Sequence, residues 1–502
     1  MKLRLLALAA LLASTGAQAL TPAQIVAARG TTLKEITFSG ASALRLSFAS
    51  YMAEICDTTT LHIYFDSASG NNHRAYACNL KVAAGNYAAG TPVVVYKRDQ
   101  GGSAQGLAPV ATNTAIAHMR ILDNSSCTVT GTPDFSDIAI PNYICTTTET
   151  RVSDAGITDV EPAILNQVPN LADNTAGDPA SGTQAAVDTS NLNVASFVQG
   201  IFGVVVNKQA YLALQRTQGL DNAGAIDEDV AKRPSLPTNF VRAMLLGGLS
   251  ASNTTKRGWG LVISETVDPS VNTKAFNICR RQPGSGTQAA SNMYFMQNPC
   301  SSSAASPLRQ ASATQPLPVA TGTYNVREES GTGGVESCVG VTRDANGNIT
   351  GGVDSVAGAY GLAVLGRENS PLPNNATPGG NKDKGYRYVR LDGAQPDRYD
   401  ATTKKGAATG DYDFVYESTL QYNTTNPNLD GDKIAFITSI RTGAPKPSAL
   451  AAADIDTQQG VMSPQGAWSA LGQYPALSNT DRPFASRLSR TAGSCSVQRY
   501  VR

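Results

Sequence analysis

The sequence has few histidines, no clustered basic residues and one long apolar run. Three histidines accompany eight cysteines, and no two cysteines have the Cys-x-x-Cys spacing, so we do not expect a zinc site. Basic and acidic side chains number 40 and 39, and no run of Lys or Arg exceeds two residues. Nucleic acids and anionic membrane surfaces both require clustered positive charge, so neither is expected as a partner. Any recognition of an anion must be local.

The long apolar run lies at the amino terminus. Residues 1–19 carry Lys2 and Arg4, continue with apolar residues and end in Ala17-Gln18-Ala19, which is the layout of a secretory signal peptide cleaved before Leu20. No later segment approaches the roughly 18 consecutive apolar residues of a membrane helix. No cysteine at the cleavage site offers lipid attachment. We therefore expect a periplasmic or secreted protein without membrane insertion.

An even number of cysteines in an exported chain favours disulfides. Pairing of sequence neighbours would join Cys56 to Cys78, Cys127 to Cys145, Cys279 to Cys300 and Cys338 to Cys495. The sequence alone does not choose between this and other connectivities.

Segments with strand-like and helix-like patterns alternate along the chain, separated by Gly/Ser turns. Strands are predicted over 33–38, 91–98, 197–206 and 275–279, and helices over 44–55, 236–249 and 288–296. This alternation is typical of α/β domains whose sheets are largely parallel. Three segments are too polar to be buried and are expected to be surface insertions: 166–191, 299–323 and 371–384.

The most informative segment is Arg281-Gln282-Pro283-Gly284-Ser285-Gly286-Thr287, between the predicted strand 275–279 and the predicted helix 288–296. A strand that turns through Gly-Ser-Gly into a helix directs backbone N–H groups, hydroxyls and the positive helix end at one point, which an arginine can also reach. The pattern predicts an oxyanion site. From the residues alone, an ordinary capped turn is the alternative, and Arg280 could face inward instead of Arg281.

Four Gly/Ser-type segments follow one another along the chain, at 39–43, 100–104, 152–155 and 281–287. With these segments the chain resembles the periplasmic phosphate-binding proteins of phosphate ABC transporters and their phosphate-binding-like and DING-type relatives. The last segment matches the family's Arg-x-x-Gly-Ser-Gly-Thr at every fixed position. The resemblance spans most of the mature chain. It implies an α/β, two-lobed type II periplasmic-binding fold, with a mainly parallel sheet flanked by helices in each lobe and a ligand cleft between the lobes.

The resemblance also implies a division of the chain and a function. After the signal peptide, 1–19, lobe I would comprise 20–195 plus 356–502, and lobe II would comprise 196–355. The implied function is capture of inorganic phosphate or a similar protonated oxyanion for an ABC permease complex. We expect a monomer, and assign no catalytic residue, cofactor or metal ion.

Carried over by position, the family's ligand contacts fall on Ser42, Ala43, Ser103, Asp154, Arg281, Ser285, Gly286 and Thr287. Asp154 would discriminate between anions, because a buried carboxylate only accepts hydrogen bonds and so favours hydrogen phosphate over sulfate. The serines could equally be helix caps, and Asp154 could cap the next segment. Gln282 and Pro283 replace the acidic residue common in the family, so a phosphate ester, another protonated oxyanion or no ligand stay open.

Two further functions stay open at this point. A phosphatase-like activity, as in DING-type relatives, would need a metal or a nucleophile, and none of His62, His73 and His118 lies in a recognisable catalytic motif. A secreted structural or adhesive protein that retains the fold without transport fits the polar insertions and the cysteines equally well.

Overall fold

The structure is a computed structural model. It describes residues 20–501 except 43, 68–71, 131–140, 176, 250–257, 302–304, 312–320, 374–375, 401, 453–459 and 490–497. The predicted signal peptide lies outside the described residues, and so does Ala43.

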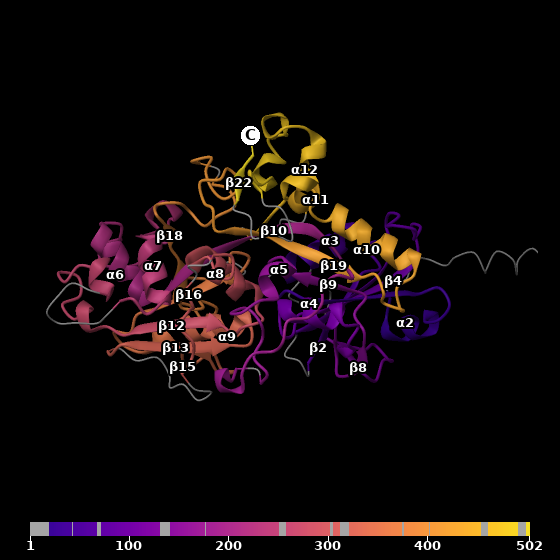
Figure 1. Ribbon diagram of the computed structural model, residues 1–502, viewed down its shortest axis with the longest axis horizontal. Coiled ribbons are helices and arrows are strands. Elements are labelled where there is room, and N and C mark those ends of the chain that lie inside the picture. Colours follow the sequence, from indigo (N-terminus) through magenta and orange to yellow (C-terminus); the bar gives the residue numbers. More distant parts are fainter. Residues whose placement is uncertain are drawn as a thin grey trace, which may run out of the picture.

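One sheet runs through both halves of the protein (Figure 1). Among the described residues it has 14 strands. Its order is β13 (Tyr324–Glu329), β12 (Phe276–Arg281), β16 (Gly361–Gly366), β10 (Leu192–Asn207), β19 (Val415–Asn423), β9 (Ala155–Thr158), β1 (Lys34–Gly40), β4 (Pro92–Arg98), β3 (His73–Asn79), β2 (His62–Asp66), β7 (Tyr143–Cys145) and β6 (Cys127–Val129). Two further strands, β17 (Tyr386–Tyr388) and β20 (Val461–Met462), pair with β10.

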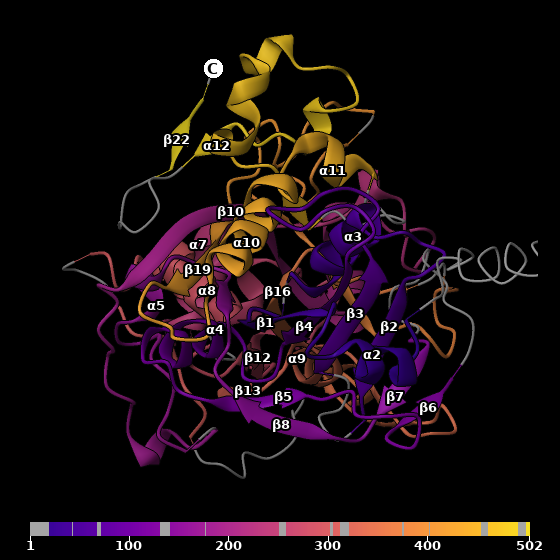
Figure 2. The same ribbon diagram turned by 90° about the vertical axis from the view of Figure 1, so that its right-hand side faces the viewer.

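Most of the parallel pairs in the sheet lie where the chain alternates strand and helix. Strands β9, β1 and β4 are parallel neighbours in one half, and so are β16, β12 and β13 in the other. The ladders that join the two halves, β10 with β16 and β10 with β19, are antiparallel. In the first half β4, β3 and β2 extend the sheet as antiparallel neighbours (Figure 2). The mixed α/β architecture confirms the predicted fold class.

The strand common to both halves is β10, which pairs with β19 along its first part and with β16 along its last. All side chains from 197 to 207 are buried. A strand covered on both faces is apolar throughout instead of alternating, and this is the predicted apolar run 197–206. The other predicted strands form as β1, β4 and β12.

Helices cover both halves of the sheet (Figure 1). Those of the first half are α2 (Pro22–Ala28), α3 (Arg45–Ile55), α4 (Ser103–Ala111), α5 (Pro162–Leu165) and α10 (Gly431–Gly443). Those of the second are α6 (Lys208–Gln218), α7 (Thr238–Leu245), α8 (Gly286–Met296) and α9 (Thr332–Val339). The predicted helix 236–249 is shorter than expected, because the chain turns at Gly247, whose φ is 72°.

Among the described residues, four short ladders lie outside the large sheet. They pair β5 (Ile116–Met119) with β8 (Thr148–Arg151), β11 (Ser235–Leu236) with β18 (Arg390–Leu391), β14 (Thr342–Arg343) with β15 (Ile349–Gly351), and β21 (Leu488–Ser489) with β22 (Arg499–Tyr500).

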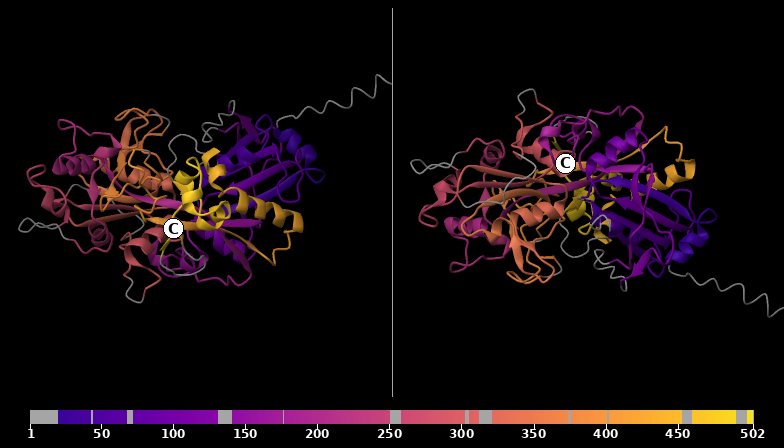
Figure 3. Two further views of the ribbon diagram at one scale, coloured as in Figure 1. Left: turned by 90° about the horizontal axis from the view of Figure 1, so that it is seen from above. Right: turned by 90° about the horizontal axis from the view of Figure 1, so that it is seen from below.

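The carboxyl-terminal segment lies over the middle of the molecule when the protein is seen from above (Figure 3). It contains α11 (Pro447–Ala452), which packs on α3, and α12 (Gln465–Trp468). Its strand β20 pairs with β10, and the backbone N–H of Arg487 donates to the carbonyl of Ala408. The segment therefore contacts the first half, the shared strand β10 and the loop after β18.

Three disulfides are described: Cys56–Cys78, Cys127–Cys145 and Cys279–Cys338. The first two match pairing of sequence neighbours, whereas Cys279 pairs with Cys338 and not with its neighbour Cys300. The reason is that Cys279 lies on β12 and α9 packs against β12, which brings Cys338 to it. Disulfides persist in oxidising compartments, so these bonds indicate an exported protein.

The polar insertion 166–191 contains only the short 3₁₀ helix Pro179–Ser181 and is mostly exposed or half-buried, as expected. The other two insertions lie partly outside the described residues. In the part of the chain that is described, no helix has the length and apolar character needed to cross a membrane. The lobe boundaries stay predictions.

Candidate functional site

Loops from both halves meet at the carboxyl ends of the parallel strands. β1, β4 and β9 supply loops from one half, and β12 supplies the Gly-Ser-Gly turn from the other. The backbone N–H of Ala104 donates to the carbonyl of Gly284 at 2.8 Å, and the N–H of Gly284 donates to the carbonyl of Asn170 at 2.8 Å. The halves are thus in direct contact here, at the edge where open α/β sheets bind ligands.

Arg281 is the buried cation of this junction. Its Nη1 donates to Ser42 Oγ at 3.4 Å and to Thr332 Oγ1 at 3.2 Å, and its Nη2 donates to the carbonyl of Ser330 at 2.8 Å. The preceding side chain, Arg280, instead bonds the Leu308 carbonyl. The structure thus turns Arg281, and not its neighbour, toward a serine of the opposite half.

Two helices begin at this junction. Ser285 is the N-cap of α8, and its Oγ accepts from the N–H of Gln288 at 3.4 Å. α4 begins at Ser103, directly after Gly102. The first N–H groups of a helix have no partner within it, and the helix dipole makes this end positive. The cap role considered for Ser285 is therefore real, and it accompanies a geometry that attracts anions.

Gly286 allows the two helix starts to approach each other. A Cβ at this position would lie 2.3 Å from Ser103 Oγ and 2.6 Å from Asp159 Oδ2. Both atoms belong to the opposite half, so any larger residue would force the halves apart. Thr287, the next residue, is buried.

Asp159 is the carboxyl group of the junction, and it was not predicted from the sequence. It directly follows β9 and is 4% exposed. Its Oδ2 accepts from Ser103 Oγ at 3.2 Å, while Oδ1 has no hydrogen-bond partner among the described residues. Burial raises the pKa of Asp159 to about 6, against the opposing effects of Arg281, Ser103 and Lys97. It is a group that can gain or lose a proton near neutral pH.

Lys97 binds the backbone of the loop that follows β1. Its buried Nζ donates to the carbonyls of Gly40 and Ala41, both at 3.1 Å, and to Asp99 Oδ1 at 2.5 Å. This support positions Ser42, which directly follows Ala41. A lysine directly after the apolar part of the predicted strand 91–98 was the available signal in the sequence.

The carboxylate predicted for the site, Asp154, lies elsewhere. Its Oδ2 accepts from the backbone N–H of Thr37 at 2.8 Å and from Thr37 Oγ1 at 2.9 Å, and its Oδ1 accepts from Lys433 Nζ at 2.9 Å. The reason is positional: Asp154 precedes β9, whereas the junction forms where the parallel strands end. The signal for Asp159 was an acidic residue directly after the short apolar segment 155–158.

A serine–histidine pair lies outside this junction. His118 Nε2 and Ser153 Oγ are 2.9 Å apart, and each residue is 1% exposed. Burial, with nearby arginines, lowers the pKa of His118 well below its usual value. A substrate has no access to this serine in the described structure. Within the described residues, no group of three His, Cys, Asp or Glu side chains is placed to hold a metal ion.

We use the term Arg281 site for Ser42, Ser103, Asp159, Arg281 and residues 285–287. A cavity of about 10 Å³ adjoins Asp159 and is lined also by Leu44 and Phe202. Such a volume holds about one water molecule. Of the residues of the Arg281 site, the lining of this cavity includes Asp159 but not Arg281, so its volume describes the space beside Asp159 alone.

Comparisons with known proteins give little at the level of sequence. No protein-family model matches the chain, and a search of curated proteins found no match. Among solved structures, an ABC-type phosphate transport receptor from Vibrio cholerae is similar, with 10% sequence identity and a TM-score of 0.32. The match covers 84% of this chain and 98% of that chain. This likeness is distant.

Proposed function

We propose that the protein is an exported solute-binding protein that holds a protonated oxyanion, with inorganic phosphate as first choice, at the Arg281 site. The observation that carries the proposal is that Arg281 bonds Ser42 of the opposite half, while Gly286, at the start of α8, packs against Ser103, at the start of α4, and against Asp159. An oxyanion that still carries a proton fits this set of groups. Arg281 supplies a permanent positive charge, the two helix starts are positive, and the carboxyl group can gain or lose a proton.

Each residue has a role in this proposal. The guanidinium of Arg281 would exchange its bond to Ser42 Oγ, 3.4 Å long, for a shorter bond to the anion. The hydroxyls of Ser42, Ser103 and Thr287 would donate to it. The hydroxyl of Ser285, the N–H of Gly286 at the start of α8 and the backbone N–H of Ala43 would complete the set of donors.

Asp159 takes the discriminating role that was predicted for Asp154. An ionised carboxylate accepts the proton of hydrogen phosphate and repels sulfate, which has no proton to give at neutral pH. Because the pKa of Asp159 is raised to about 6, the carboxylate is mostly ionised above that pH. Rejection of sulfate should therefore weaken on acidification, as Asp159 becomes protonated.

The anion would enter when the halves separate. β10 pairs with strands of both halves, so bending of β10 and β19 would open the junction. Opening breaks the Ala104–Gly284 hydrogen bond and closing restores it. Release of the anion to an ABC permease complex is the use we propose for this motion.

The test is isothermal titration of the mature protein, freed of bound anion, with phosphate and then with sulfate near pH 8. Arg281→Ala should weaken phosphate binding roughly 100-fold or more, since a buried charge loses its partner. Arg327→Ala, which removes a partly exposed arginine of the neighbouring strand β13, is the matched control and should bind normally.

The carboxyl assignment has its own pair of variants. Asp159→Asn should admit sulfate, because an amide also donates hydrogen bonds. Asp154→Asn makes the same change at a buried carboxylate held by Thr37 and Lys433, and should leave the selectivity unchanged. If Asp154→Asn alone admitted sulfate, the carboxyl assignment would be reversed.

A second function is favoured by the direct bonds between the halves. Besides the backbone contacts, Asn292 Nδ2 donates to Asn170 Oδ1 at 2.8 Å, and the cavity at Asp159 is about 10 Å³. A secreted structural protein could keep the fold with its halves locked. No heat with phosphate or sulfate, together with undetectable opening by hydrogen exchange at residues 284–287, would favour this function.

A further inference from the structure

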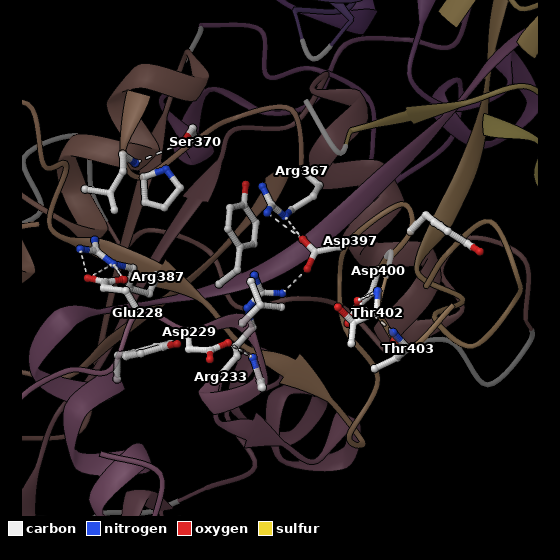
Figure 4. A pocket seen from close by; sticks show the side chains of 17 residues that line it. Glu228, Asp229, Arg233, Arg367, Ser370, Arg387, Asp397, Asp400, Thr402 and Thr403 are labelled. Atoms are coloured by element: carbon white, nitrogen blue, oxygen red, sulfur yellow. Dashed lines mark hydrogen bonds and ion pairs between the residues drawn. The ribbon is translucent and has the colours of Figure 1, made fainter. Parts of the chain in front are cut away.

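A cavity of about 680 Å³ lies in the half that contains β16 and β17. Its walls come from Tyr211 of α6, the loop at 228–233, Arg367 at the end of β16, Tyr388 of β17 and the loop at 397–403 (Figure 4). It shares no lining residue with the Arg281 site. Its volume is within the usual range of small-molecule sites, roughly 300 to 1,000 Å³.

Two arginines meet on one carboxylate in the middle of this cavity (Figure 4). Arg233 Nη1 donates to Asp397 Oδ2 at 2.7 Å, and Arg367 donates to Asp397 Oδ1 from Nε at 2.9 Å and from Nη2 at 2.7 Å. One carboxylate balances only one of the two positive charges. The centre of the cavity therefore has an excess of positive charge, with N–H groups of both guanidiniums beyond those that bind Asp397.

Carboxylates without an arginine partner lie on either side of this centre. Asp229 accepts from the N–H of Ala231 at 2.9 Å, and Asp400 accepts from the N–H groups of Thr402 and Thr403 at 2.7 and 3.1 Å. Neither forms a salt bridge with any described residue. These two carboxylates differ from Glu228, which Arg387 binds from Nε and Nη2.

The charges of the cavity are separated but nearly balanced. Three arginines and four carboxylates line it. A further arginine, Arg390, is not among the lining residues and donates to the carbonyls of Val230 and Ala231, which are. A simple anion would be repelled by Asp229 and Asp400, and a simple cation by the two central arginines. The lining thus suits a ligand with one charge of each sign.

We propose that this cavity binds a short peptide with free termini. Its carboxylate would accept hydrogen bonds from Arg233 and Arg367, and its ammonium group would donate to Asp229 or Asp400. A cavity of this volume has room for several residues, and the Tyr211 ring and the Leu372 side chain in its wall provide apolar surface for side chains. This site is independent of the anion site proposed above.

The test is equilibrium dialysis of the mature protein against an equimolar mixture of tripeptides with free termini, read by mass spectrometry. Enrichment of tripeptides is expected. N-acetylated and C-amidated versions of the enriched peptides should each bind about tenfold more weakly or worse, since each loses one charge-assisted contact. No enrichment at about 1 mM peptide, or equal binding of the blocked peptides, would overturn the proposal.

Two variants locate the site. Asp229→Asn with Asp400→Asn removes both charges, while the amide oxygens can still accept from the same backbone N–H groups, so folding should be retained. This double variant should lose most peptide binding. Asp221→Asn makes the same change at a carboxylate outside the cavity that accepts from the N–H of Gly224, and should bind peptide normally.

A competition experiment distinguishes the two proposed sites. Saturating phosphate should leave peptide binding unchanged, whether or not phosphate itself binds. Displacement of the peptide by phosphate would place it at the Arg281 site and overturn the proposal. Retention of peptide binding by the double variant would overturn it as well.

Discussion

The pKa values of two buried carboxyl groups, Asp159 and Asp397, are shifted in opposite directions. They are 4% and 6% exposed, so burial penalises the charged form of both. At Asp159 burial prevails and raises the pKa to about 6. At Asp397 burial is outweighed by Arg367 and Arg233, which lower the pKa to about 2.

The difference comes from direct contact. Asp397 receives hydrogen bonds from both guanidiniums, whereas Arg281 donates to Ser42, Thr332 and Ser330 and acts on Asp159 only through its charge. Direct bonds from two guanidiniums fix the carboxylate in its ionised form, so Asp397 has a structural role. A carboxyl group without such bonds, like Asp159, can exchange a proton near neutral pH.

Removal of the ionised Asp397 carboxylate should have the largest effect on the free energy of unfolding. Asp397→Ala leaves two buried guanidiniums without their partner and should lower the free energy of unfolding by about 3 to 5 kcal/mol. Urea unfolding near pH 7 measures it. A loss under about 1 kcal/mol would mean that the arginines find other partners.

The titratable carboxyl group should behave in the opposite way. The folded-state pKa of Asp159, about 6, exceeds its ordinary value of 3.8, so the folded form binds the proton more tightly and stability falls as pH rises from about 4 to above 6. Asp159→Asn cannot ionise. The variant should exceed the parent in stability by up to about 3 kcal/mol near pH 8, and match it near pH 4.

Urea unfolding of parent and variant across this pH range measures the difference. Contributions of other groups cancel in the comparison. A difference that does not change with pH would show that Asp159 keeps its ordinary pKa, and the contrast with Asp397 would disappear.

A somewhat smaller effect is expected at Asp397 in acid. Its lowered pKa means that it stabilises the fold above about pH 4, and that this contribution, about 2 kcal/mol, is lost as pH falls through about 2. Asp397→Asn should therefore be less stable than the parent near pH 5, and the gap should close toward pH 2. A difference in stability between parent and variant that widened in acid would contradict the lowered pKa of Asp397.

The smallest effect is expected at an exposed pair. Lys405 Nζ and Asp411 Oδ1 are 4.0 Å apart, with side chains 69% and 38% exposed. Lys405→Ala should change the free energy of unfolding by less than about 1 kcal/mol, because water and salt screen the pair. Thermal unfolding in low and high salt measures it, and a larger change would show that exposure alone does not separate structural from weak ion pairs.

Local patterns were sufficient for several elements. The apolar segments that became β1, β4, β10 and β12, and the helix-compatible segments that became α3 and α8, were predicted because periodicity and turn residues act over a few positions. The choice of Arg281 over Arg280 came from the spacing of the motif in the resemblance, because from the residues alone Arg280 could equally face inward. Exact helix ends were less certain, as the early stop of α7 at Leu245 shows.

The choice between Asp154 and Asp159 shows where local patterns fail. Both residues are acidic, both flank the same short strand and both are buried. Only the direction of β9 beside β1 decides which end of the strand reaches the loops. That direction is set by pairing between residues more than a hundred positions apart, which one sequence does not reveal.

The sequence by itself determined the α/β class, the Gly-Ser-Gly turn with its arginine, and the absence of clustered charge. Tertiary structure alone decided that Cys279 pairs with Cys338, that Asp159 and not Asp154 bonds Ser103, and that Arg233 and Arg367 share Asp397. The physical reason is the distance along the sequence between the residues that interact. Turns and helix starts depend on neighbouring residues, whereas disulfides, buried charges and cavities depend on which distant strands become neighbours in the sheet.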